Sequence, residues 1–345
     1  MASNKKTSLE TAKASKKDEF YTQLSDIEKE LVYYREYFRD KIVFCNCDDP
    51  YESNFFKYFA LNFNALGLKK LIATCYDGSP ITQQELPLFA DEENEPKKKA
   101  YKVEISEVPD LDGNGATDLT DVQLLLKSST YNAISELKGN GDFRSPECIE
   151  LLKQADVVVT NPPFSLFREY IAQLIKFDKR FLVIGNMNAI TYKEIFPLIK
   201  ENKMWLGVTR QGTGSMWFKV PSDFPIKSGQ KIENGIRYQT IGSTAWFTNL
   251  DHSRRHEEII LVKHYSPDDY PKFDNYDGIN VDRVTDIPCD YEGFLGVPIT
   301  FLGSYNPEQF EIIKFRKGDD DKDLTVNGKS PYFRILIRNK KPQIS

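Results

Sequence analysis

The fold is indicated most directly by residues 156–164, which read DVVVTNPPF. The run from Asp156 to Thr160 is short and apolar, as is typical of a strand that is buried on both faces of a sheet. It stops at Asn161, because the two prolines that follow have no N–H groups and cannot extend a strand ladder. We therefore expect a buried strand over 156–160 and a rigid turn directly after its carboxyl end.

Two more apolar runs lie upstream and are expected to be strands. They are residues 41–47, KIVFCNC, and residues 70–75, KLIATC. Between them a helix is expected over 51–66, with Asp49 as its N-cap and Gly67 directly after its end. Strand, helix and strand at this spacing predict a βαβ unit, and therefore parallel strands with a right-handed crossover.

A second unit of the same kind is expected around the strand at 156–160. Helices are predicted over 146–154 and 165–177, followed by an apolar strand over 181–186. From residue 204 onward the pattern changes to short strands with glycine and aromatic residues. The predicted fold class is α/β, a doubly wound and mostly parallel Rossmann-like sheet with an inserted acidic segment and a β-rich C-terminal region.

The composition predicts three parts along the chain. Residues 1–17 are rich in Lys, Ser and Ala and are expected to form a disordered basic tail. Residues 18–203 are expected to form the main domain, which an insertion over 81–126 interrupts. Residues 204–345 are expected to supply late sheet strands and an accessory region.

The sequence also bears on where the protein works. It contains no apolar window of about 18 residues, so no transmembrane helix and no membrane partner are expected. The first residues have no apolar core of the kind that a secretory signal requires. The five cysteines are scattered and odd in number, which favours reduced thiols and a cytoplasmic location.

The formal net charge of −5 is unevenly distributed. Residues 83–123 carry eleven acidic and four basic side chains, so the rest of the chain is weakly positive. Residues 202–264 carry nine Lys and Arg against five Asp and Glu. This basic stretch is the candidate surface for a polyanionic partner, and its candidate phosphate contacts are Arg210, Arg254 and Arg255.

The Asn-Pro-Pro-Phe turn has the groups needed to activate an aromatic amine. Ligands of a doubly wound sheet bind beyond the carboxyl ends of its strands, where this turn is expected. An amine on an aromatic ring is a poor nucleophile, because its lone pair is delocalised into the ring. The side-chain oxygen of Asn161 and the carbonyl of Pro162 can accept both amine hydrogens, and Phe164 can stack on the ring.

Pro163 completes the turn and stiffens it. A plain strand-ending turn would explain the bare tetrapeptide equally well. Its position after a buried strand, inside a βαβ unit and downstream of Gly141-Asp142-Phe143, favours the chemical interpretation.

Four further segments accompany this turn. They read DEFYT at residues 18–22, DDPYESNFFKYF at 48–59, TAWFTNLDH at 244–252 and GVPITFL at 296–302. With them the chain resembles the EcoRI-type adenine-specific DNA methyltransferases of restriction–modification systems, from about residue 18 to residue 338. The resemblance implies a site-specific transfer of a methyl group from S-adenosylmethionine to adenine N6 in double-stranded DNA.

The resemblance also implies a set of cofactor-binding residues in four short segments. They are Phe20, Tyr21 and Thr22; Asp48 and Pro50; Asp77; and Asp142 and Phe143. The first segment would pack against the methionine end of the cofactor, and the second would meet its amino group. The third would bind the ribose hydroxyls or be a plain turn residue. The fourth would meet the cofactor's adenine, or its Asp142 would lie in a solvated turn ahead of the helix that begins at Pro146. The second segment departs from the family pattern, because it lacks the usual glycines.

Double-stranded DNA is the implied substrate, and a cognate restriction endonuclease that acts on the same site is a candidate partner without a stable complex. An enzyme that modifies a base inside a duplex has to flip that base out. Two alternatives stay open. The acceptor could be an RNA base or a protein glutamine amide, since Asn-Pro-Pro-aromatic turns also suit planar amides. The chain could also be a non-enzymatic DNA-binding protein on the same scaffold.

A separate acidic loop lies inside the predicted insertion. Residues 110–121 read DLDGNGATDLTD, with Gly at loop position 6 and oxygen-bearing side chains at positions 1, 3, 5, 9 and 12. The pattern fits an EF-hand-like calcium loop, apart from Asp at position 12 where Glu is usual. The candidate ligands of a structural Ca²⁺ are Asp110, Asp112, Asn114, the carbonyl of Ala116, Asp118 and Asp121. An acidic turn without a metal would satisfy the same pattern.

Overall fold

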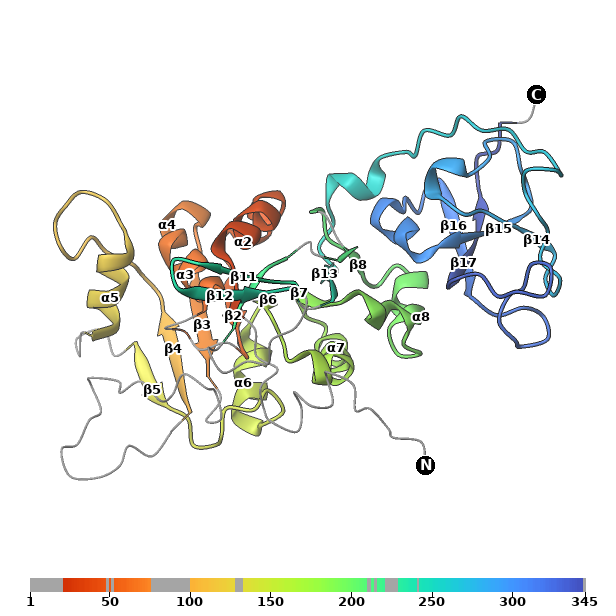
Figure 1. Cartoon of the computed structure of the whole chain (residues 1–345). Helices are drawn as coiled ribbons and strands as arrows, with labels where there is room; N and C mark the ends of the chain where they lie inside the picture. The colour runs from red at the N-terminus through yellow and green to blue at the C-terminus, as the bar shows by residue number, and fades with distance from the viewer. Residues whose placement is uncertain are drawn as a thin grey trace. The chain divides into compact units, whose positions relative to one another are not determined.

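A computed structural model describes most of the chain. The described residues are 21–47, 50, 53–75, 100–127, 133–209, 212–213, 216–220, 229–240 and 242–343. The predicted tail at 1–17 and the first part of the predicted insertion lie outside these ranges. Contacts divide the chain into two compact units, Met1–Ala189 with Thr209–Leu250 and Ile190–Val208 with Asp251–Ser345. Figure 1 shows the elements of both units.

The first unit is built around a mixed β-sheet with a parallel centre. The strands are, in spatial order, β5 (Ile134–Glu136), β4 (Tyr101–Ile105), β3 (Lys70–Thr74), β2 (Ile42–Cys45), β6 (Val157–Thr160), β7 (Arg180–Asn186) and β13 (Ser243–Thr248). The strands β3, β2, β6 and β7 are parallel, as the two βαβ units predict. The strands β4 and β5 on one side and β13 on the other are antiparallel, and β9 (Gly212–Thr213) pairs with β13.

The parallel strands agree with the predicted apolar runs because they are covered on both faces. Val43, Phe44 and Val157 to Val159 are all 0% exposed. The covering helices are α2 (Leu24–Leu31), α3 (Asn54–Leu61), α4 (Phe63–Leu66), α6 (Pro146–Gln154) and α7 (Phe167–Lys176). In Figure 1, α2, α3 and α4 lie above these strands and α6 and α7 below them. The helices η1 (Val32–Tyr37), η2 (Phe164–Leu166) and α5 (Leu119–Lys127) also belong to this unit, and η3 (Met187–Thr191) includes its boundary at Ala189.

The helix expected over 51–66 begins later than predicted. Its N-cap is Ser53 and not Asp49, because the Ser53 hydroxyl accepts hydrogen bonds from the N–H groups of Phe55 and Phe56, at 3.2 and 3.3 Å. The helix is interrupted at Asn62 and resumes as α4. It ends at Gly67 as predicted, where the backbone adopts a left-handed conformation with φ of 64°.

A second, smaller sheet belongs to the same unit and was not predicted. It contains β1 (Tyr21–Thr22), β10 (Phe218–Lys219), β12 (Ile236–Gln239) and β11 (Gln230–Glu233), all antiparallel. Thr22 pairs with Phe218 in this sheet. Residues 21–22, before the parallel strands in sequence, are therefore paired with residues 218–219, which come after them.

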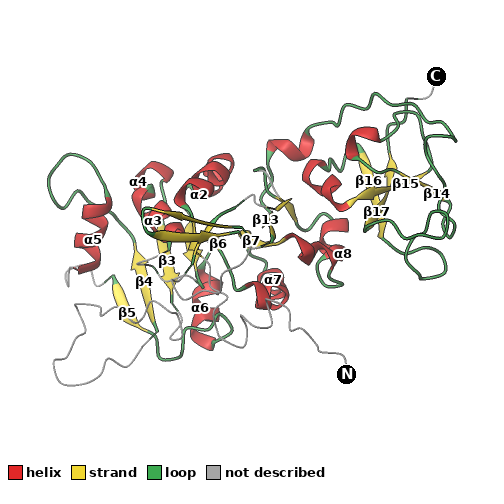
Figure 2. Cartoon of the chain, in the orientation of Figure 1, coloured by secondary structure: helices red, strands yellow, loops and turns green. Residues whose placement is uncertain are grey.

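The second unit has its own sheet, whose strands Figure 2 shows in yellow. The sheet order is β14 (Gly278–Asn280), β15 (Phe294–Pro298), β17 (Arg334–Asn339) and β16 (Phe310–Phe315). Leu295, Val297 and Ile335 to Ile337 are 0% exposed and form part of its core. The remaining elements are α8 (Phe196–Lys200), β8 (Trp205–Leu206), η4 (Ser253–His256), η5 (Val284–Asp286) and η6 (Ile299–Ser304).

The composition predicts one domain boundary, after residue 203. The observed units instead divide the chain after residues 189, 208 and 250. Residues 209–250 belong to the first unit because β13 pairs with β7 along five residue pairs. A boundary taken from composition alone follows the chain, whereas strand pairing brings a late segment back into the first unit. Within the described ranges, the structure has no helix that combines the length and the hydropathy needed to cross a membrane.

Candidate active site at the carboxyl edge of the sheet

The Asn-Pro-Pro-Phe turn begins where β6 ends, at the carboxyl edge of the parallel strands. Asn161 is 6% exposed, and Pro162 is buried beside it. The hydroxyl of Thr160, the last residue of β6, donates a hydrogen bond to the backbone carbonyl of Asn46. Asn46 directly follows β2. The turn is therefore fixed to the neighbouring strand at the edge where ligands of such sheets bind.

Asn46 connects three elements next to the turn. Its carbonyl accepts from Thr160, and its Oδ1 accepts a hydrogen bond from the hydroxyl of Tyr170 on α7. Asn46 is 2% exposed, and a buried amide of this kind is stabilised only when its polar atoms have partners. The sequence prediction missed Asn46 and Tyr170. A polar residue that ends an apolar strand is the signal that could have indicated Asn46.

The ring of Phe164 lies edge-on to the ring of Phe218. The two ring centroids are 6.3 Å apart and the interplanar angle is 88°. Phe164 is 6% exposed and Phe218 is 0% exposed. Because Phe218 pairs with Thr22, three segments that are far apart in the sequence converge here. Phe218 lies among the short aromatic strands expected after residue 204, but the prediction gave it no role in the site, because that pattern does not show which strands meet.

Thr22 belongs to β1 and lies against the N-terminus of α3, the helix that follows β2. Its carbonyl accepts a hydrogen bond from the side-chain amide of Asn54 at 2.7 Å, and Asn54 is the first residue of α3. The Thr22 hydroxyl is buried and has no hydrogen-bond partner among the described residues. A buried hydroxyl without a partner costs about 1–3 kcal/mol, which a polar group of a bound ligand would recover. Phe20 and the side chain of Tyr21 lie outside the described residues.

Gly141 brings its neighbours Asp142 and Phe143 to the same edge. Its φ is +76°, and a Cβ atom at this position would lie 2.0 Å from the carbonyl oxygen of Cys75, directly after β3. Phe143 is 5% exposed, and its ring packs edge-on against Tyr170 with centroids 5.1 Å apart. Phe143 is thereby linked to the tyrosine that hydrogen-bonds Asn46.

Asp142 is held by Arg144, which the sequence prediction missed. The guanidinium donates to the Asp142 carboxylate through Nη2 at 2.7 Å and through Nε at 2.9 Å. The backbone N–H of Arg144 donates to the same carboxylate at 2.8 Å. The hydrogen bonds from Arg144 hold the pKa of Asp142 below its ordinary value. Asp142 is therefore an ionised carboxylate that already has strong donors on both oxygens.

The remaining residues predicted to bind the cofactor are only partly described. Pro50 is among the described residues and is buried. In the sequence it lies between β2 and α3. Asp48 and Asp77 lie outside the described residues. The described part of the predicted set is thus Thr22, Pro50, Asp142 and Phe143, together with the backbone of Tyr21.

Arg255, predicted to contact phosphate, is instead packed inside the second unit. Its guanidinium carbon lies 3.6 Å from the centroid of the Trp205 ring, and its Nη2 donates to the side-chain oxygen of Asn202 at 3.1 Å. Arg255 is 9% exposed, and burial lowers the pKa of its guanidinium. An arginine with so little exposed surface has few donors free for a phosphate, so its surroundings favour a structural role for Arg255 over the predicted one.

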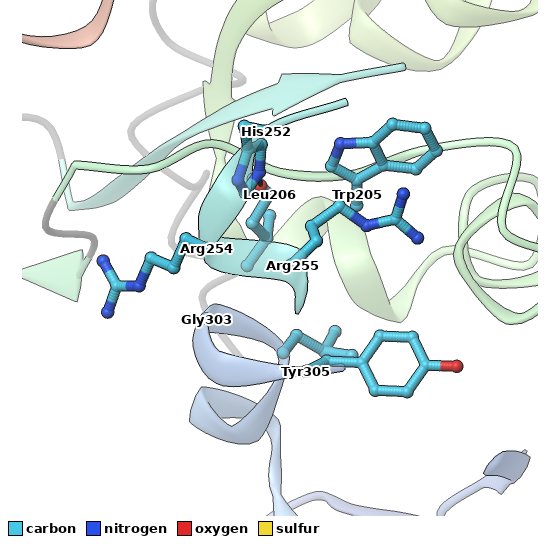
Figure 3. A pocket seen from close by; sticks show the side chains of 8 residues that line it. Trp205, Leu206, His252, Arg254, Arg255, Gly303 and Tyr305 are labelled. Atoms are coloured by element: carbon cyan, nitrogen blue, oxygen red, sulfur yellow. Dashed lines mark hydrogen bonds between the residues drawn. The ribbon is translucent and has the colours of Figure 1, made fainter. Parts of the chain in front are cut away.

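Arg254 differs from its neighbour. It is half-buried, and one of its terminal nitrogens donates to the carbonyl of Val208. Figure 3 shows the pocket that both arginines line, in which Arg254 and Arg255 extend in opposite directions and only Arg255 reaches Trp205. Arg210 lies outside the described residues.

The acidic loop at 110–121 is closed by its own carboxylates. Asp121 is 0% exposed and accepts from the backbone N–H groups of Leu111, Asp112 and Asp118 at 2.6, 3.2 and 2.8 Å. These backbone hydrogen bonds hold the pKa of Asp121 below its ordinary value. One carboxylate oxygen each from Asp110, Asp112 and Asp121 lies within 4.8 Å of the other two.

The other candidate calcium ligands lie around the same loop. Asn114 donates through its side-chain amide to Asp112 at 3.0 Å and to Asp118 at 3.3 Å. The N–H of Ala116 donates to the side-chain oxygen of Asn114 at 2.9 Å. Gly115 has a φ of +87°, which agrees with the glycine that such loops need at position 6.

Comparison with known proteins gives the family of the chain. Residues 8–340 match the family model described as adenine-specific methyltransferase EcoRI. The Type II methyltransferase M.EcoRI of Escherichia coli is 53% identical over 339 residues, which cover 97% of each chain. M.MgeORF184P of Mycoplasma genitalium is 38% identical over 355 residues, covering 96% of this chain and 98% of the relative. M.MpnI of Mycoplasma pneumoniae is 35% identical over 351 residues, covering 95% and 97%.

No solved structure matches the chain. The family match extends over nearly all of the sequence, so it includes both units and the turn at the end of β6. The chain belongs to the EcoRI family of adenine-specific methyltransferases.

Proposed function

We propose that the protein transfers a methyl group from S-adenosylmethionine to N6 of an adenine at a specific site in double-stranded DNA. The observation that carries the proposal is the buried turn from Asn161 to Phe164 at the carboxyl end of β6, in a member of a family of adenine-specific methyltransferases. S-adenosylmethionine, when bound, supplies an electrophilic sulfonium methyl group.

The turn offers oxygen acceptors, because its prolines lack N–H groups. The Asn161 Oδ1 atom and the Pro162 carbonyl each accept one N6 hydrogen. The nitrogen would move toward a tetrahedral geometry, and its lone pair would be free to attack the methyl carbon while the carbon–sulfur bond breaks and S-adenosylhomocysteine leaves as a neutral thioether. The methylated nitrogen is strongly acidic and loses a proton to solvent, so no general base is needed before the attack. The rings of Phe164 and Phe218 would line the pocket that receives the base.

The proposed cofactor site lies at the carboxyl ends of β2 and β3. The buried Thr22 hydroxyl without a described partner fits a site that a polar ligand completes. Phe143 supplies an apolar surface for the cofactor's adenine, and Asp142 keeps a negative charge beside it. Phe20, Tyr21, Asp48, Pro50 and Asp77 stay in the proposed set on the resemblance alone.

We propose that the first unit performs the chemistry and that the second unit assists recognition of DNA. Arg254 stays in the proposed set of phosphate contacts because it keeps part of its surface exposed, and Arg210 stays on the charge pattern alone. A cognate endonuclease that cleaves the same site is also proposed, because relatives carry the designation Type II methyltransferase.

Transfer of tritium from labelled S-adenosylmethionine tests the proposed substrate. Duplex DNA, RNA and protein are offered separately, and the labelled base is identified after digestion of the DNA. We expect label on N6-methyladenine in duplex DNA. Label on RNA or on protein alone would contradict the proposal, and so would the absence of label from all three.

Replacement of Asn161 by alanine tests the mechanism. Asn161→Ala removes one of the two acceptors that act mainly in the transition state, so we expect kcat to fall at least about 100-fold while duplex binding persists. The control Gln154→Ala removes an exposed amide from the last turn of α6, at the opposite edge of the sheet. Full activity of Asn161→Ala would refute the proposed role of the turn.

We also propose that the loop at 110–121 binds Ca²⁺ as a structural ion. The close approach of three carboxylates supports this, and so does Gly115 at the required position. The oxygen ligands are of the kind that a hard cation prefers. The loop lies far from the turn at Asn161 in sequence, and no catalytic role is proposed for it.

A further inference from the structure

A histidine, a cysteine and an aspartate meet in the second unit, in a cluster that the proposed methyl transfer does not use. The His264 Nδ1 atom lies 2.9 Å from Asp290 Oδ2 and 3.7 Å from the Cys289 sulfur. One potential ligand atom from each residue lies within 4.8 Å of the other two. Cys289 is 2% exposed, whereas 76% of the His264 side chain is exposed.

The two segments that carry these residues are held together by their backbones. Lys263 and Pro288 form a parallel bridge, and the N–H of Cys289 donates to the carbonyl of Lys263 at 2.8 Å. The N–H of Tyr265 donates to the other oxygen of Asp290 at 2.8 Å. This contact leaves Oδ2 directed at His264 and fixes the carboxylate. The fold therefore positions the backbones that carry the three residues, and it also fixes the Asp290 carboxylate.

Aromatic packing supports the same two segments. The rings of Tyr265 and Tyr291, each next to a residue of the cluster, have centroids 4.6 Å apart. Tyr265 also packs against Tyr270, with centroids 6.0 Å apart. Rigid neighbours of this kind are what a small metal site needs to keep its ligands in place.

We propose that His264, Cys289 and Asp290 form a binding site for a divalent transition-metal ion, with Zn²⁺ as the best match. Thiolate, imidazole and carboxylate are all ligands that zinc accepts, and three protein ligands leave a fourth position for water. The thiolate disfavours Ca²⁺ and Mg²⁺, which prefer oxygen ligands.

Two of the three distances between the ligand atoms can be compared with those of a tetrahedral site. Zn–S of about 2.3 Å and Zn–N of about 2.0–2.1 Å place sulfur and nitrogen about 3.6 Å apart in a tetrahedron, against 3.7 Å between the Cys289 sulfur and His264 Nδ1. Nitrogen and oxygen ligands would lie about 3.3 Å apart in the same tetrahedron. The present hydrogen bond between His264 and Asp290 would thus have to open by roughly 0.4 Å.

Metal binding changes the protons of the cluster in a defined way. The Cys289 thiol loses its proton to solvent, because the thiolate is the ligand. The His264 imidazole would bind the ion through Nδ1 in its neutral form, with the ring proton on Nε2. Thiolate and carboxylate together balance the charge of a divalent ion.

Cobalt(II) binding to the full-length protein tests the site, because Co²⁺ reports its ligands by absorption. The protein is stripped with a chelator, kept reduced with a phosphine, and titrated with Co²⁺. We expect a thiolate-to-cobalt charge-transfer band that saturates at one equivalent and that Zn²⁺ abolishes. Ca²⁺ should leave the band unchanged. Absence of the band from the wild-type protein would overturn the proposal.

Three variants assign the ligands. Cys289→Ser should lose the charge-transfer band, and His264→Ala should weaken Co²⁺ binding at least about tenfold. The matched control Cys148→Ser removes another buried thiol, on α6, and should keep the band. If Cys289→Ser does not fold, the Co²⁺ affinity of His264→Ala tests the site. This variant should fold, because the His264 side chain is largely exposed. An unchanged band in Cys289→Ser, or unchanged affinity in His264→Ala, would refute the site.

Discussion

Gly141 and Gly235 have the same backbone conformation but different surroundings. Both have a φ of +76°, which L-residues with a side chain rarely adopt. A Cβ atom at Gly141 would lie 2.0 Å from the carbonyl oxygen of Cys75, whereas a Cβ atom at Gly235 would have no atom within 4 Å. The two positions therefore separate the cost of the conformation from the cost of close approach.

We expect alanine at either position to lower the free energy of unfolding by about 1–2 kcal/mol through the left-handed conformation. Gly141→Ala should lose about 1–3 kcal/mol more, because the added methyl group meets a backbone oxygen that cannot move away freely. Urea denaturation of both variants measures the difference. Equal losses of unfolding free energy in Gly141→Ala and Gly235→Ala would show that the close approach of Gly141 to the Cys75 carbonyl does not add to the cost.

The local part of the candidate site could be predicted from the sequence, and its partners could not. Asn161 and Phe164 follow an apolar strand directly, so their place at the carboxyl edge follows from the chain itself. Phe218 and Tyr170 reach the site from other elements. Nothing in their own neighbourhood distinguishes them from ordinary core aromatics. Contacts between distant segments depend on pairing and packing that a local pattern does not contain.

At the scale of elements, the start of α3 depends on one hydroxyl. The Ser53 side chain accepts from two backbone N–H groups of the first turn. We expect Ser53→Ala to lower the free energy of unfolding by about 1 kcal/mol, and Ser53→Gly by only a few tenths. Chemical denaturation gives both values. A neutral Ser53→Ala variant would mean that the helix start is fixed by other contacts, such as that between Asn54 and Thr22.

The sequence pattern predicted the parallel strands better than the helix start for a physical reason. Strands covered on both faces need a continuous apolar run, which residues 70–74 and 157–160 provide. Several residues before α3 satisfy the composition of an N-terminus, and Asp49 has the right chemistry as well as Ser53. The two-residue strand β1 is too short for a periodic pattern to reveal it.

The acidic loop before α5 gives a prediction at the same scale. If Ca²⁺ holds this loop, a chelator should lower the melting temperature, and added Ca²⁺ should restore it. Asp112→Asn removes an exposed candidate ligand and should abolish the response. The control Asp319→Asn changes an exposed aspartate of the second unit and should keep it. A melting temperature that changes with neither chelator nor added Ca²⁺ would show that the backbone hydrogen bonds to Asp121 close the loop without a metal ion.

At the scale of the whole molecule, a net charge of −5 has to be reconciled with a polyanionic substrate. The acidic side chains are concentrated in residues 83–123, and residues 202–264 are basic. Association with DNA then depends on the local field of the basic stretch and not on the sum of charges. Because phosphate contacts release counterions, the logarithm of the binding constant should fall linearly with the logarithm of salt concentration.

Arg254 and Arg255 should respond differently in that experiment, although they are neighbours. Arg254→Ala should reduce the steepness of the salt dependence by about 0.9, the contribution of one phosphate contact, and Arg254→Lys should restore it. Arg255→Ala should leave the salt dependence unchanged and lower the melting temperature, because its guanidinium packs on Trp205 and bonds Asn202 inside the second unit. Fluorescence anisotropy with a labelled duplex over a salt series, with melting curves for each variant, measures both effects. A wild-type salt dependence in Arg254→Ala would remove this residue from the DNA surface, and a reduced one in Arg255→Ala would mean that its packed position opens when DNA binds.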